Sequence, residues 1–173
     1  ITNRKIQLFL CGAAALFWEL ALIRWQGSCV RVVSYYTNFV LIAAFFGLGV
    51  GALTGRFQKV KLEILAIPSI AACLGYAVLL SQMIHFNPSD PGEHVWLGAP
   101  SGIADAHIPF FQAFALPLWL VMGSIYVLTA FVFVVFGNWL SSLFKMQKPL
   151  EGYSIEILGS LFGILAFGAV TAI

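Results

Sequence analysis

Residues 34–55 read SYYTNFVLIAAFFGLGVGALTG, and this stretch decides the fold class. It holds no Asp, Glu, Lys, Arg or His, and it reaches the length of about 20 apolar residues that a helix needs to cross a bilayer. Within it, Gly47, Gly51 and Gly55 recur every four residues, which places three small residues on one helix face. The stretch therefore predicts a membrane-spanning helix that lets another backbone approach its glycines closely.

The rest of the chain has the same character. Of 173 residues, 61% are hydrophobic and 9% are charged, against about 25% charged in soluble domains, and the mean hydropathy is +0.95. This composition excludes a disordered chain, a soluble enzyme and a nucleic-acid binder. We predict an all-α integral membrane protein in which residues 1–173 form one domain within the lipid bilayer. Its five predicted spans are 6–27, 34–55, 62–83, 109–138 and 150–173.

Three details of these spans carry further expectations. The fourth is long enough that we expect it to tilt, to run past the membrane surface or to bend at Pro117, and Pro68 is a candidate kink in the third. The chain begins at Ile1 and ends on an apolar run, so we expect it to be part of a longer polypeptide. No cleavable signal peptide is visible, because the first apolar run is already of spanning length.

The basic residues predict a cytoplasmic N-terminus. In that orientation only Arg24 and Arg31 lie outside, and the other seven Lys and Arg residues lie inside. The external loop, residues 84–108, contains no Lys or Arg. Those seven residues are Arg4, Lys5, Arg56, Lys59, Lys61, Lys145 and Lys148.

Small residues recur on two other predicted helices. Gly159 and Gly163 repeat the four-residue spacing in the last span, and Gly12 with Ala13 and Ala15 offers a weaker version in the first. The GLGVG segment in the second span also resembles a nucleotide-binding loop. It lacks the preceding strand and the polar residues that such a loop requires, so we interpret all of these glycines as helix-packing positions.

Charged groups within a span cost at least about 2.5 to 3.5 kcal/mol at the bilayer centre, so each calls for a partner or a purpose. Glu19 and Glu156 either belong to a proton or substrate path or are neutral or paired carboxyls that fix helix register. The second interpretation is favoured, because no chain of titratable residues joins them. Asn38 is the predicted partner of Glu19. The intramembrane polar candidates are Glu19, Arg24, Asn38, Glu156 and Arg56, the last of which could reach Glu156.

The sequence predicts no catalytic residue, cofactor or metal. Nucleophile, Walker and paired-carboxylate motifs are absent, and the cysteines lack metal-ligand spacing. The three histidines all fall near or within the external loop, where irregular spacing makes them weak metal candidates and a solvated or partner-docking loop the simpler reading. These histidines are His85, His94 and His107, and the cysteines are Cys11, Cys29 and Cys73.

Three segments resemble the membrane region of the membrane-bound spermidine synthase-like proteins. They are LFLCGAAALFWELALIRW (8–25), YYTNFVLIAAFFGLGVGALTGR (35–56) and PLEGYSIEILGSLFGILAF (149–167), and they cover about a third of the chain in the expected order. The matching residues are Glu19, Arg24, Asn38, Gly47, Gly49, Gly51, Tyr153, Ser154, Gly159, Ser160 and Gly163.

The resemblance implies a membrane domain in the bacterial inner membrane that anchors a soluble aminopropyltransferase-like domain. That soluble domain is not within this sequence, so no catalytic residue carries over. An alternative is a non-catalytic accessory subunit of a respiratory or photosynthetic complex, with other membrane proteins as partners. A third alternative is a transporter fragment, which needs deep carboxylates that water can reach.

Overall fold

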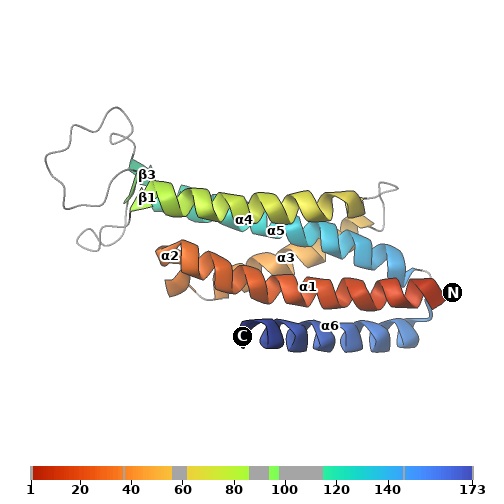
Figure 1. The fold of residues 1–173 in the computed structure, drawn as a ribbon. Helices are drawn as coiled ribbons and strands as arrows, with labels where there is room; N and C mark the ends of the chain where they lie inside the picture. The colour runs from red at the N-terminus through yellow and green to blue at the C-terminus, as the bar shows by residue number, and fades with distance from the viewer. Residues whose placement is uncertain are drawn as a thin grey trace, which may run out of the picture.

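The computed structural model describes residues 2–36, 38–55, 62–85, 94–97, 115–145 and 147–172. They form a bundle of long helices with a small sheet at one end (Figure 1). The long helices are α1 (Thr2–Cys29), α3 (Asn38–Gly55), α4 (Ala66–Met83), α5 (Leu118–Phe144) and α6 (Pro149–Thr171). A short helix, α2 (Arg31–Tyr35), follows α1, and a 3-10 turn, η1 (Leu62–Leu65), leads into α4. Helices α1, α3, α5 and α6 are each long and apolar enough to cross a membrane, and α4 is a shorter apolar helix.

The small sheet joins the end of α4 to the start of α5. It contains β1 (Ile84–His85), β2 (His94–Leu97) and β3 (Ala115–Pro117), paired antiparallel in that order. Ile84 pairs with Leu97, and Trp96 pairs with both His85 and Ala115. Part of the predicted external loop is therefore extended backbone that caps this end of the bundle.

The helix limits differ from the predicted spans mainly at prolines. The fourth predicted span began at Pro109, whereas Ala115–Pro117 form β3, helix α5 begins at Leu118, and residues 109–114 lie outside the described part of the chain. Proline lacks the N–H that a helix interior requires, so the helix starts after Pro117 rather than bending there. At its other end α5 continues past Asn138 to Phe144. Pro68 falls in the first turn of α4, where a proline is tolerated, so it introduces no mid-helix kink.

Two other limits also shift. The second predicted span is divided, because Ser34 and Tyr35 belong to the short α2 and the long helix starts at Asn38. The first span is longer than predicted and reaches from Thr2 to Cys29.

Successive long helices run in alternating directions, so that the labels N and C in Figure 1 lie toward opposite ends of the bundle. Helices α1, α4 and α6 point one way, and α3 and α5 point the other way. The core lies where α1, α3, α4 and α5 meet, and its largest fully buried side chains include Leu8, Leu22, Val40, Val132 and Phe133. Helix α6 lies outside this core against α1, and its buried residues are the three glycines Gly152, Gly159 and Gly163.

Candidate functional site

The glycine stripe of α3 packs directly on α5. A Cβ at Gly47 would meet the carbonyl oxygen of Ala130, and a Cβ at Gly51 would meet that of Val134. From the first contact to the second, the position moves four residues toward the C-terminus in both helices, so α3 and α5 run parallel. Gly137 of α5 faces back onto Leu48 of α3, and its Cβ would meet the Leu48 carbonyl oxygen. The two helices thus interlock through glycines from both sides, and no side chain fits between them.

The last glycine of the stripe, Gly55, lies where two polar side chains of α5 hold the end of α3. A Cβ there would lie 3.0 Å from the carbonyl oxygen of Asn138. Ser141 donates a hydrogen bond to the carbonyl of Ala52 at 3.2 Å, and Lys145 donates one to the carbonyl of Gly55 at 2.8 Å. Lys145 therefore satisfies a terminal helix carbonyl and places a positive charge at the negative end of the helix dipole.

A second parallel pair joins α1 and α6. A Cβ at Gly159 would meet the carbonyl oxygen of Phe9, and one at Gly163 would meet that of Ala13. Gly12 of α1 is less tightly covered, since its Cβ would lie 3.1 Å from the carbonyl oxygen of Glu156. Two ring contacts follow the same register, Phe9 with Phe162 at 5.6 Å and Phe17 with Phe167 at 5.8 Å between centroids.

The opposite face of α1 forms a buried seam toward the core. Its members are spaced three or four residues apart, which keeps them on one side of the helix. They are Leu8, Cys11, Ala15, Glu19, Leu22 and Gln26. The seam therefore carries a carboxyl and an amide into the interior of an otherwise apolar bundle.

Gln26, at the C-terminal end of the seam, connects three helices. Its Nε2 donates to Thr129 Oγ1 of α5 at 2.8 Å and to Cys73 Sγ of α4 at 3.2 Å. All three residues are buried, and Gln26 Oε1 has no hydrogen-bond partner among the residues that the structure describes. None of Gln26, Cys73 and Thr129 was predicted as a site residue from the sequence. The available signal was Gln26 itself, an amide seven residues beyond Glu19 and hence on the same helix face.

Glu19 is 4% exposed and lies two turns below Gln26 on the seam. Within the described residues it has no hydrogen-bond or ion-pair partner. Arg24 is exposed, and its separation of five residues from Glu19 puts it on a different face of α1.

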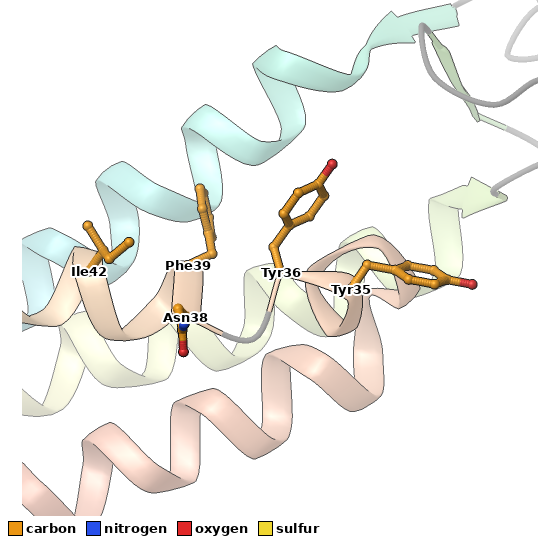
Figure 2. Close-up of a pocket in the computed structure, with 5 residues that line it drawn as sticks. All are labelled: Tyr35, Tyr36, Asn38, Phe39 and Ile42. Atoms are coloured by element: carbon orange, nitrogen blue, oxygen red, sulfur yellow. The ribbon is translucent and has the colours of Figure 1, made fainter.

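Asn38, the predicted partner of Glu19, lies instead at the exposed start of α3 (Figure 2). There it lines a shallow pocket of about 330 Å³ together with Tyr35, Tyr36, Phe39 and Ile42. Figure 2 shows Tyr35 directed away from the bundle, while the ring of Phe39 points toward α5. Phe39 also contacts the ring of Tyr126 of α5, with centroids 5.5 Å apart.

Glu156 lies on α6 at the level of Gly12, near the other end of α1. It is half-buried and accepts a hydrogen bond from Ser160 of its own helix at 3.1 Å. Arg56, its predicted partner, lies outside the described residues. One turn before Glu156, the exposed Glu151 forms an ion pair with Lys5 of α1 at 2.9 Å, which ties the two helix ends together.

The histidines do not form a metal site within the described part of the chain. His85 and His94 contribute backbone to β1 and β2, and His107 lies outside the described residues. No group of three or more His, Cys, Asp or Glu residues comes together among the residues that the structure describes. The three cysteines, which all belong to the described residues, form no disulfide there; Cys11 and Cys73 are buried and Cys29 is half-buried.

Taken together, the site residues provide one buried carboxyl, one buried amide cluster and two glycine-packed helix pairs. Hydrogen-bonding and proton exchange are the chemistry that these side chains support. No family model, curated protein or solved structure matches this chain.

Proposed function

We propose that this chain is the membrane-embedded domain of a spermidine synthase-like protein and anchors a soluble aminopropyltransferase-like domain. The observation that carries the proposal is the contact between α1 and α6. These helices contain the first and last of the three segments that resemble the family, more than a hundred residues apart in sequence. Gly159 and Gly163, two of the matching residues, lie at that contact.

The proposal includes a cytoplasmic N-terminus in a bacterial inner membrane. Arg4 and Lys5 at the start of α1, Lys145 after α5 and Lys148 before α6 all belong to the same end of the bundle (Figure 1). The positive-inside rule favours that end as the cytoplasmic one. Because α6 ends on the opposite side, a cytosolic domain that follows it in the chain needs one more crossing.

Single-cysteine labelling tests the orientation. Lys148→Cys and Ser28→Cys place exposed thiols near opposite ends of the bundle, in a background where the half-buried Cys29 is replaced by Ser. We expect a membrane-impermeant maleimide added to intact cells to label Ser28→Cys and to leave Lys148→Cys unlabelled until the membrane is opened. The reverse pattern would overturn the proposed orientation.

The anchoring role is tested on the native polypeptide, purified from its membrane in mild detergent. A mass well above 18.9 kDa, with aminopropyl transfer from a decarboxylated S-adenosylmethionine donor to a polyamine, supports the proposal. The matched measurement uses Gly163→Ala, which disturbs the α1–α6 contact, beside Gly168→Ala, whose Cβ meets nothing within 4 Å. If the catalytic domain is membrane-bound through this bundle, only Gly163→Ala reduces the yield of membrane-bound activity.

A second candidate function is that of a non-catalytic accessory subunit, favoured by the exposed surface of α6. Exposed apolar side chains surround most of α6, and a partner helix would cover them as well as lipid does. A native mass near 18.9 kDa in a fixed-ratio complex would support this candidate and reject the anchor. The exposed side chains of α6 include Leu150, Tyr153, Ile157, Leu158, Leu161, Phe162, Ile164, Leu165 and Val170.

A further inference from the structure

The proposed anchoring function does not use the buried carboxyl of Glu19. Its carboxyl lies on the seam of α1, seven residues before Gln26, which at 1.5 Å per residue is about 10 Å along the helix axis. The contacts of Gln26 with Cys73 and Thr129 place this seam against α4 and α5. Glu19 is buried on the same seam at 4% exposure, ten residues before the end of α1 at Cys29.

The helices that cover the seam offer no cation. Within their bounds, α3, α4 and α5 contain no Asp, Glu, Lys, Arg or His. Several of their polar and titratable side chains are engaged with other groups: Cys73 and Thr129 bind Gln26, the Tyr76 hydroxyl is 2.7 Å from Ser124 Oγ, and Tyr126 lies against aromatic rings of α3. Among the described residues the buried Asn138 Nδ2 has no hydrogen-bond partner, and Asn138 lies beside Gly51 and Gly55, closer to the C-terminal end of α5 than Thr129, which binds Gln26.

The charged and titratable groups of α1 and α6 also fail to reach Glu19. Glu156 of α6 lies beside Gly12, two turns below, and binds Ser160. On α1 itself, Cys11 is two turns below on the seam, Arg24 is exposed on another face, and Lys5 pairs with Glu151 at the helix end.

A buried carboxylate without a partner is strongly destabilising, so one of two partners must neutralise it. A metal cation prefers several converging ligands, and no group of three or more His, Cys, Asp or Glu residues comes together among the described residues. A proton requires no ligand besides the carboxyl itself. We propose that Glu19 is a proton-binding site on the buried seam of α1 and is the neutral acid in this helix arrangement.

This proposal has a definite sign in its pH dependence. If Glu19 is protonated in the folded bundle and ionised in the unfolded chain at neutral pH, the folded state binds one more proton. Stability then falls as pH rises above roughly 4, where a free glutamate titrates. The unfolding equilibrium constant increases by up to about tenfold for each pH unit across that window. Replacement by a neutral amide of the same size removes this dependence.

The first measurement is infrared spectroscopy of the full chain at neutral pH in dodecyl maltoside micelles, a detergent without a carbonyl group. We expect the carbonyl band of a protonated carboxylic acid, present in the wild type and in the control Glu156→Gln and missing in Glu19→Gln. If the folded wild type shows no such band, the proposal is overturned, and this outcome does not depend on whether any variant folds.

The second measurement is the free energy of unfolding against pH for the same three proteins. The wild type and Glu156→Gln should lose stability as pH rises, and Glu19→Gln should show a flatter profile. Equal slopes in the wild type and Glu19→Gln would contradict the proposal. If the native protein carries out aminopropyl transfer and Glu19 is not protonated, the proton site is rejected and the proposed function is retained.

Discussion

The two glycine-packed helix pairs use the same contact and differ in what surrounds it. In α3 and α5, glycines come from both helices and both partners also border the core, so the contact lies inside the bundle. In α1 and α6, the tightest glycines come from α6, whose remaining surface is exposed apolar side chain. A four-residue glycine spacing therefore predicts close approach of two backbones. Whether that approach supports the whole fold depends on the other faces of the two helices.

The sharpest test of this difference is Gly51→Ala. Its Cβ would lie 2.9 Å from the Asn138 nitrogen and closer still to the Val134 carbonyl oxygen, and backbone atoms cannot give way cheaply. We expect the free energy of unfolding to fall by about 3 kcal/mol, the upper end for an overpacked contact. Gly49→Ala is the matched control on the same helix, because its Cβ meets nothing within 4 Å. Equal unfolding midpoints for the two variants would show that the α3–α5 contact is looser than described.

The corresponding change in the outer pair is Gly163→Ala, which would place a Cβ against the Ala13 carbonyl. Because α6 can move outward from α1, we expect a smaller loss of about 1 to 2 kcal/mol. Hydrogen exchange should rise in α6 while α3 and α5 stay protected. Gly168→Ala serves as the control. A rise in exchange across all five long helices would mean that the outer pair is as central as the inner one.

Thr129→Val tests the link between the two pairs, since Thr129 of α5 accepts the hydrogen bond of Gln26 of α1. We expect a loss of about 0.6 to 1.5 kcal/mol, the range for hydrogen bonds between helices in membranes. Thr54→Val is the matched control, because the Thr54 hydroxyl binds carbonyls of its own helix. If both variants unfold at the same point, the amide cluster does not hold the pairs together.

The smallest expected effect belongs to Lys5→Ala, which removes the ion pair with Glu151 at the end of the outer pair. Both side chains are more than a third exposed, so we expect a small loss of stability that disappears at high salt. Lys148→Ala, a nearby exposed lysine, provides the comparison. An effect that persists in about 1 M salt, where the Debye length is about 3 Å, would indicate a contact other than the ion pair.

Much of the helical architecture was predictable, because long apolar runs and glycine spacings are local patterns. The spacing of Gly47, Gly51 and Gly55 predicts a helix face of small residues. The structure shows which residues cover that face, namely Ala130, Val134 and Gly137 of α5. The helix starts near Pro117 and Pro68 were harder to predict, because a proline is compatible with a helix start as well as with a kink.

The candidate site was predictable only in part. Glu19 was identifiable as a charge within a span, but its partner was sought at Asn38, which lies at the exposed start of α3. The cluster at Gln26 was missed, because glutamine, threonine and cysteine carry no formal charge and each is ordinary in an apolar run. Only the three-dimensional meeting of α1, α4 and α5 distinguishes them.

Neither glycine-packed pair joins helices that are consecutive in the chain. During synthesis, α3 is complete well before its partner α5 appears, and α1 waits until residues 149–171 have left the ribosome. The face of α1 around Gly12 and Ala13 stays uncovered for most of that time. The inner pair therefore has both of its helices before α6 is synthesised, whereas the outer pair does not.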